Sequence, residues 1–290
     1  MKKQDVYDLI NEKIIEKLES GVSPWRKPWN GSYLPCNHLS KKPYRGINYF
    51  MLSLSPYPSN EWLTFKQAKE LKGNVKKGEK STPIFFWNTF NKEVENSKGE
   101  MKKETIPFLK VYHVFNLEQC ENIEAAKGDE SQKIVFEPVK ECEKIIEGFP
   151  LGFAPIKEGE SRAYYHPTFD YINLPKKENF ISKEFYYSVL FHESIHATGH
   201  EKRLNRETLT QASYFGSSNY SHEELIAEMG ASYLCGMTGI SDATIDNSAS
   251  YLSGWLAAIR KDNKLVLKAA TQAQKAVDYL LQKTYETQGE

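Results

Sequence analysis

The stretch from Leu190 to His200 holds the residues whose types and spacing could do chemistry, because it contains the pattern H-E-x-x-H. On an α-helix, residues four positions apart share a face, so His192 and His196 could offer both imidazoles to one metal ion. Glu193 would then reach a water molecule on that ion. The apolar residues before the motif predict a buried helix over residues 180–191 that continues into it.

A third ligand would distinguish a catalytic site from a chance match, because catalytic zinc sites pair three protein ligands with an open fourth position. The metzincin pattern would place a third histidine three residues after Gly199, but Lys202 stands there, so that interpretation fails. The gluzincin pattern instead takes a glutamate from a second helix. Residues 221–234 have the form of such a helix.

This second helix supplies Glu224 and Glu228, which are four apart and share a face. We expect Glu224 to bind the metal and Glu228 to hold a ligand imidazole in orientation, with the reverse assignment open. Two imidazoles and one carboxylate predict one divalent metal ion, by ligand type zinc, and they also suit manganese or another first-row ion. Position alone suggests that Tyr220 donates a hydrogen bond to an oxyanion.

Together these residues predict metal-dependent peptide hydrolysis. The metal would lower the pKa of its bound water toward 7, and Glu193 would take the proton as the hydroxide attacks a carbonyl carbon. Residues 161–175 predict two short strands around a turn just before the motif helix. Tyr164, Tyr165 and His166 either face the cleft there or are ordinary sheet residues.

The length and composition of the chain indicate which class of protein carries this site. At 290 residues, with 40% hydrophobic and 13% aromatic residues, the chain can bury the cores of two domains. It has no apolar run of about eighteen residues that could span a bilayer. The start lacks a secretory signal and the four cysteines lack paired spacing, so we expect a cytoplasmic protein with reduced thiols.

The net charge of zero hides an asymmetry. Residues 1–120 hold 20 basic and 13 acidic residues, and residues 121–290 hold 18 and 25. Within residues 21–90 the count is 11 to 3, and the basic residues alternate with aromatic ones. Stacking surfaces beside phosphate-binding charges predict single-stranded nucleic acid binding. The alternative is that the aromatics belong to the core and the lysines are only solvated.

The elements expected around these features define an α+β protein of two domains. The boundaries are placed at residues 1–125 and 134–290, because the polar stretch 121–133 is typical of a linker. The expected helices cover residues 5–19, 49–54, 64–71, 138–148, 251–259 and 262–282, and the expected N-terminal strands cover residues 82–87 and 106–115, joined by a charged hairpin.

Eight motifs resemble the ArdC-type antirestriction proteins. In the first half, in the order of that family, they are Pro43–Asn48, Trp62–Ala68, Val75–Lys80 and Val114–Gln119. Those that resemble its zincin-like domain are Leu190–His200, Arg203–Arg206, Glu223–Glu228 and Tyr251–Leu256. The similarity covers nearly the whole chain, and the charged hairpin at residues 91–104 is the one departure.

The resemblance implies a protein of conjugative plasmids and related mobile elements, with an N-terminal domain that binds single-stranded DNA and a C-terminal metallopeptidase-like domain. Arg45 and Asn48 could instead brace their turn, and Trp62 and Phe65 are expected in the core. The implied DNA-contact positions are Trp25, Arg26, Trp29, Tyr44, Arg45, Asn48, Thr64, Gln67, Lys76, Lys77 and Lys80.

Two functions of different classes follow. In one, the DNA-binding half delivers a peptidase to DNA-bound proteins such as restriction enzymes. In the other, the protein protects single-stranded DNA by binding it, and the metal site is structural or catalytically silent. Glu193 favours the enzyme, because a purely structural site needs no general base beside an open coordination position.

Overall fold

The computed structural model describes residues 6–19, 34–57, 59–95, 101–123, 138–210, 218–240 and 249–283. These residues form two compact units of mixed helices and strands, which confirms the predicted α+β class with two parts. Unit 1 comprises the described residues of Met1–Pro35, Tyr44–Pro56 and Gly128–Lys283, and unit 2 those of Cys36–Pro43 and Tyr57–Lys127. None of the helices in these stretches is long and apolar enough to cross a membrane.

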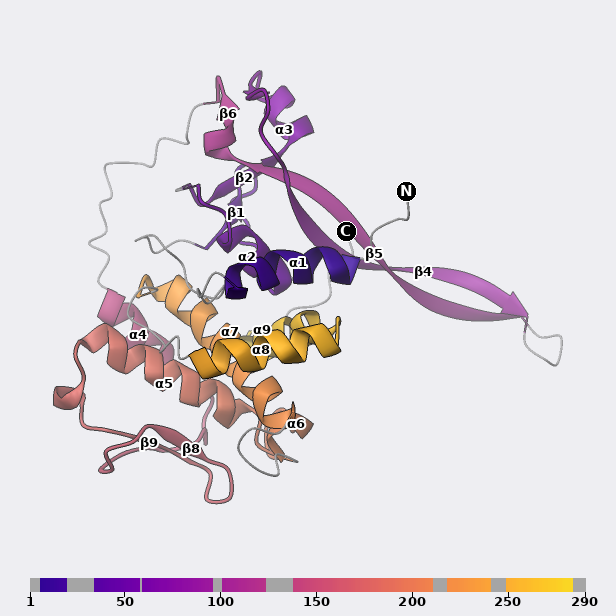
Figure 1. The fold of residues 1–290 in the computed structure, drawn as a ribbon. Coiled ribbons are helices and arrows are strands. Elements are labelled where there is room, and N and C mark those ends of the chain that lie inside the picture. Colours follow the sequence, from indigo (N-terminus) through magenta and orange to yellow (C-terminus); the bar gives the residue numbers. More distant parts are fainter. Residues whose placement is uncertain are drawn as a thin grey trace. The chain divides into compact units, whose positions relative to one another are not determined.

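Unit 2 is built on a four-stranded sheet with the strand order β1-β2-β5-β4 (Figure 1). Leu63, Ala68 and Cys120 form its small core. Among the described residues of this sheet, β1 and β2 pair in parallel, and the other neighbouring strands pair antiparallel. The elements of unit 2 are β1 (Cys36–Asn37), β2 (Glu61–Thr64), α3 (Phe65–Glu70), β3 (Asn74–Val75), β4 (Thr82–Glu95), β5 (Met101–Asn116), the 3-10 turn η1 (Leu117–Gln119) and β6 (Cys120–Glu121), which pairs with β3.

The ribbon formed by β4 and β5 is longer than the sequence predicts. The expected strands end at residue 87 and begin at residue 106, but the antiparallel ladder continues until Glu95 faces Met101. Its register places Lys92 opposite Glu104 and Glu93 opposite Lys103. A charged sequence that suggests a loop can therefore continue a strand pair.

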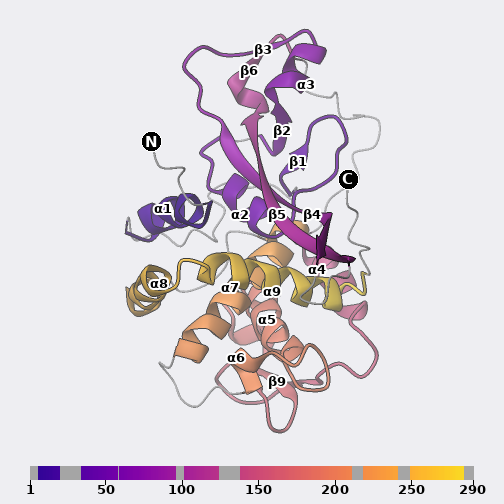
Figure 2. The same ribbon diagram turned by 90° about the vertical axis from the view of Figure 1, so that its right-hand side faces the viewer.

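Unit 1 is a helical bundle with a three-stranded sheet of order β7-β9-β8. Helix α7 packs against both α5 and α9 (Figure 2). The elements of unit 1 are α1 (Val6–Glu19), α2 (Ile47–Ser53), α4 (Pro138–Glu147), β7 (Ile156–Glu158), β8 (Tyr164–His166), β9 (Tyr171–Leu174), the 3-10 turn η3 (Lys177–Asn179), α5 (Lys183–Thr198), α6 (Glu207–Thr210), α7 (Ser218–Thr238), α8 (Ala249–Lys261) and α9 (Leu265–Leu280).

A glycine lets α5 and α7 approach closely. A Cβ added at Gly230 of α7 would lie 2.6 Å from Cδ1 of Ile195 in α5, which is closer than real Cβ atoms approach. Any side chain at this position would therefore require the Ile195 side chain or the helices to shift. These helices carry the predicted metal ligands, and Gly230 allows them to pack closely.

The compact units divide the chain differently from the predicted boundaries at residues 125 and 134. Helices α1 and α2 belong to unit 1, because α1 packs on α8 and α9, and α2 packs on α9. The Asn11 side-chain amide donates a hydrogen bond to the Asn263 carbonyl at 2.8 Å, and the Tyr49 hydroxyl donates one to the Ser232 carbonyl at 3.1 Å. The predicted boundaries for the functional domains stay a prediction.

Candidate metal centre

Helix α5 positions the H-E-x-x-H motif. It begins where the Ser182 hydroxyl accepts a hydrogen bond from the Phe185 backbone N–H at 3.1 Å, and it ends at Thr198. The predicted helix is therefore confirmed, with its start at Lys183. Because the motif lies in its last two turns, His192 and His196 point from one face toward α7.

Helix α7 brings Glu224 to the two imidazoles. The Nε2 atoms of His192 and His196 lie 3.1 Å apart, and each lies 3.5 Å from a carboxylate oxygen of Glu224. Around a tetrahedral metal ion with ligands at about 2.0–2.1 Å, neighbouring ligand atoms lie roughly 3.3–3.4 Å apart. The three side chains therefore already have the spacing that a divalent metal ion requires.

The charges at this site suit a cation. Burial opposes protonation of His196, but the Glu224 and Glu223 carboxylates outweigh it and raise the pKa of His196 well above its ordinary value. Burial also opposes ionisation of Glu224, yet His196 and His192 hold the pKa of its carboxyl well below the usual range. Glu224 is therefore an anion that supplies charge to a bound metal ion.

Each histidine has a second carboxylate behind its other ring nitrogen. Glu228 Oε1 lies 3.8 Å from Nδ1 of His192, and Glu223 Oε1 lies 3.3 Å from Nδ1 of His196. A carboxylate at Nδ1 favours the tautomer whose Nε2 lone pair faces the metal. At 3.8 Å Glu228 lies behind His192 beyond hydrogen-bond distance, so its orienting role stays a prediction, and the sequence argument missed Glu223.

Glu223 is itself held by a buried arginine that returns from the loop after α5. Arg206 Nε donates to Glu223 Oε2 at 3.1 Å, its Nη2 forms an ion pair with Oε1, and the Thr208 hydroxyl also donates to this carboxylate. Burial disfavours the ionised form, but His196 and Arg206 lower the pKa of Glu223 to about 2. The carboxylate behind His196 therefore stays charged.

Arg206 also ties this carboxylate to the end of α5. Its guanidinium donates to the Ile195 carbonyl at 2.7 Å and to the Thr198 hydroxyl at 2.6 Å. A Cβ added at Gly199 would lie 2.7 Å from Nη2 of Arg206. The glycine that follows the motif thus makes room for the guanidinium. The signal available in the sequence was the Arg203–Arg206 motif, to which no role was given.

The other residues that the sequence placed near the metal differ in their surroundings. Glu193 is buried, at 8% exposure. Tyr220 lies in α7, but its side chain falls outside the described part of the structure. Tyr165 is an ordinary sheet residue, because its buried hydroxyl donates to Asp170 at 2.8 Å and accepts from Arg203 at 3.1 Å. Tyr164 and His166 alternate with it and stay half-buried on the other face.

Comparisons with known proteins agree with this architecture. The N-terminal domain of anti-restriction factor ArdC matches residues 4–115, and a zincin-like metallopeptidase domain matches residues 143–272. The metal-free crystal structure of antirestriction protein ArdC from plasmid R388 has a TM-score of 0.76 and 39% identity, covering 96% of this chain and 97% of that one. The chain belongs to the ArdC antirestriction family.

Other relatives extend the comparison. The Mn(II)-bound structure of the R388 ArdC protein has a TM-score of 0.74 and 36% identity, covering 96% of this chain and 98% of that one. Two DNA primases TraC from Escherichia coli are 33% identical over 96% of this ArdC-family chain, which spans only 27% and 20% of their lengths. Protein y4eC of Sinorhizobium fredii is 30% identical, covering 95% of this chain and 91% of that protein.

Several DNA-contact positions implied by the ArdC resemblance are buried or form contacts within the protein. Tyr44 and Asn48 are buried, and Arg45 forms an ion pair with Asp278 of α9. Thr64 and Gln67 form a reciprocal capping box at the start of α3. These contacts favour the bracing alternative for Arg45 and Asn48. Trp25, Arg26 and Trp29 lie outside the described residues.

The lysines and some unforeseen aromatics are exposed. Lys76, Lys77 and Lys80 lie on the surface of unit 2, and Lys76 Nζ donates to the Glu118 carbonyl at 2.8 Å. Trp62 is buried as expected, but the expectation for Phe65 was wrong, because its ring is 53% exposed at the first residue of α3. Sequence reasoning also gave no role to Phe86 and Tyr112, which are exposed on the ribbon.

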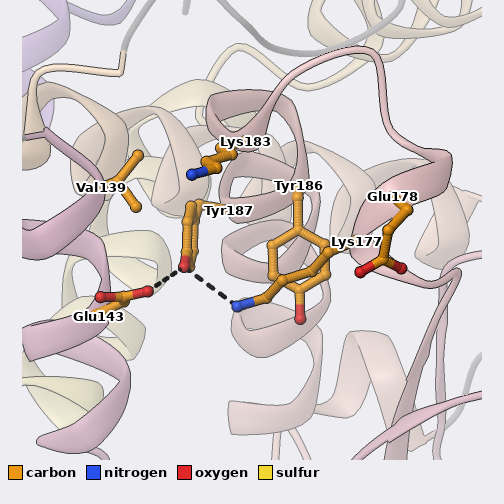
Figure 3. Close-up of a pocket in the computed structure, with 7 residues that line it drawn as sticks. All are labelled: Val139, Glu143, Lys177, Glu178, Lys183, Tyr186 and Tyr187. Carbon is orange, nitrogen blue, oxygen red and sulfur yellow. Dashed lines mark hydrogen bonds between the residues drawn. The ribbon is translucent and has the colours of Figure 1, made fainter.

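A separate cavity of about 320 Å³ lies beside the start of α5 (Figure 3). Lys177 Nζ lies 4.9 Å and 5.2 Å from the ring centroids of Tyr186 and Tyr187, and the Tyr187 hydroxyl donates to Glu143 at 2.7 Å. Tyr186 precedes His192 by six residues, which places it roughly 120° around the helix from that ligand. The cavity is therefore not part of the metal centre.

Proposed function

We propose that this ArdC-family chain is an antirestriction protein of a mobile element that binds single-stranded DNA and hydrolyses peptide bonds at a zinc site. The observation that carries the enzymatic half is the ligand triad of His192, His196 and Glu224 with Glu193 on the same helix. The DNA-binding half rests on family membership and on the basic excess of residues 1–120.

The ligand chemistry supports zinc, because two imidazole nitrogens and a carboxylate oxygen are a common catalytic zinc set. When bound, such an ion would lower the pKa of a water molecule and polarise a carbonyl group. The chain would do the rest: Glu223 and Glu228 orient the imidazoles, and Gly230 keeps α5 close to α7.

Glu193 is the residue we assign to proton transfer. It lies on the ligand helix, is buried, and directly follows His192, so its carboxylate is held near the ligands away from bulk water. Tyr220, two turns before Glu228 on α7, is proposed as the hydrogen-bond donor to the oxyanion. A DNA-bound protein such as a restriction enzyme is the proposed substrate.

The test is Glu193→Gln, an isosteric change that removes the base and keeps the ligands. We expect metal content and single-stranded DNA binding to stay at the wild-type level while antirestriction activity is lost. The measurement is the transfer efficiency of an unmodified plasmid into a restricting recipient, relative to a non-restricting one. Full protection by the variant would instead support a protein that protects DNA by binding alone.

A further inference from the structure

Unit 2 carries a pair of exposed aromatic rings that the core does not explain. Phe86 of β4 and Tyr112 of β5 are 43% and 38% exposed, and their ring centroids lie 5.5 Å apart at an interplanar angle of 82°. Ile84, which faces Tyr112 across the ladder, is buried. The pair thus lies beside a buried position of the ribbon, with apolar ring surface left in water.

A cation accompanies these rings. Lys110 faces Phe86 in the β4–β5 register, and its Nζ lies 5.0 Å from the ring centroid of Tyr112. The same combination recurs at α3, where Nζ of Lys69 lies 5.7 Å from the ring centroid of the exposed Phe65. Aromatic faces beside positive charge are the composition that binds nucleobases and their phosphates together.

The lysines that precede β4 add positive charge. Two acidic residues lie between these lysines in the sequence, and both have partners within the protein. Glu70 forms an ion pair with Lys66 at 3.7 Å, and Glu79 accepts a hydrogen bond from Gln119 at 2.8 Å. The structure records no ion pair for Lys77 or Lys80 within its described residues, and both are exposed. From Lys80 to Phe86 the chain spans at most about 22 Å, so the Lys80 backbone lies within that distance of the rings' strand.

We propose that Phe86, Tyr112 and Lys110 form a stacking platform for the bases of single-stranded DNA, with the phosphates running toward Lys77 and Lys80. This inference rests on the proposed DNA-binding function and names the surface that performs it. A duplex fits the platform poorly, because its bases are stacked on one another and cannot reach the rings.

The experiment titrates the full-length chain into a fluorescently labelled single-stranded oligonucleotide and follows anisotropy over a series of salt concentrations. Phe86→Ala and Tyr112→Ala should each weaken binding about 5- to 150-fold, the loss expected for one stacked base, with the salt dependence unchanged. Tyr112→Phe should bind as well as the wild type. Lys110→Gln should flatten the log-log salt slope by roughly 0.7.

Phe169→Ala is the matched control, because it removes an exposed ring from unit 1 and should leave affinity unchanged. Photocrosslinking of the wild-type chain to an oligonucleotide that contains 5-bromouracil should give adducts at Phe86 or Tyr112, independently of how the variants fold. If the wild type binds but both alanine variants bind equally well, the platform is overturned and DNA binding stands. A wild-type chain that does not bind single-stranded DNA overturns both.

Discussion

The candidate metal centre and the proposed DNA-binding surface differ in how far their residues are fixed by the fold. At the metal centre, His196 and Glu224 are buried and His192 is half-buried, and the outer ring nitrogens of the two histidines lie 3.3 Å and 3.8 Å from carboxylate oxygens of Glu223 and Glu228. On unit 2, the exposed lysines and rings make few contacts in the described structure that hold them in one conformation. One site is organised before its ligand arrives, and the other is a surface of charge and stacking.

This difference follows from the geometry that a metal ion and a DNA strand each require of their binding sites. A metal ion accepts ligand atoms only within a few tenths of an ångström, and the chain places a carboxylate behind each histidine. A single strand of varied sequence presents different bases to the same place, and stacking tolerates this because every base has an aromatic face. Substitutions should therefore have steep effects at the first site and graded effects at the second.

The largest effect is expected from removing a metal ligand. His192→Ala or His196→Ala should lose most of the bound metal, because two remaining ligands bind far more weakly than three. Metal analysis of the purified variants measures this, with His166→Ala as a control outside the cluster. If both variants keep full occupancy, these histidines do not hold the metal.

The next effect separates the carboxylates around the centre. Glu224→Gln should lower metal affinity severely, whereas Glu223→Gln and Glu228→Gln should each lower it about 10- to 100-fold, because they act through an imidazole. Competition with a metal-binding dye gives the affinities. Glu207→Gln, beside Arg206 but exposed, should change nothing. A larger loss for Glu228→Gln than for Glu224→Gln would exchange their assigned roles.

A smaller effect should follow from crowding Arg206. Gly199→Ala places a methyl group against the guanidinium and should cost about 1–3 kcal/mol of unfolding free energy, the usual range for overpacking. Thermal and urea unfolding of the metal-free protein measure it without reference to activity. If the variant unfolds like the wild type, the guanidinium moves aside freely and does not hold Glu223 firmly.

The smallest effects distinguish a residue that contacts DNA from one that stabilises the fold. Lys77→Ala should flatten the salt slope of single-stranded DNA binding by roughly 0.7 and leave stability unchanged, because its ammonium is exposed. Arg45→Ala should lower stability by about 0.2–1 kcal/mol through loss of the half-exposed pair with Asp278 and leave the salt slope unchanged. The reverse pattern would return Arg45 to the DNA-binding surface.

The same contrast explains what the sequence could predict. The spacing of His192 and His196 encodes one face of a helix, so local periodicity was enough to pair them, and the gluzincin pattern pointed to Glu224 on a second helix. Glu223 could not be found that way, because its role depends on Arg206 returning from a loop. Phe65 and Trp62 have similar sequence surroundings, and only the tertiary fold decides that one ring is exposed and the other buried.

The assembly of unit 1 from both ends of the chain has a consequence for its synthesis. The hydrogen bond between Asn11 and Asn263 closes a sequence separation of 252 residues, and the Arg45–Asp278 pair closes 233. Helix α1 is translated well before α8 and α9, the helices that pack on it and on which the burial of its Ile10 and Ile14 depends. Until then these apolar faces have no native partner, so the nascent chain is exposed to aggregation, and loop closure over such distances slows folding.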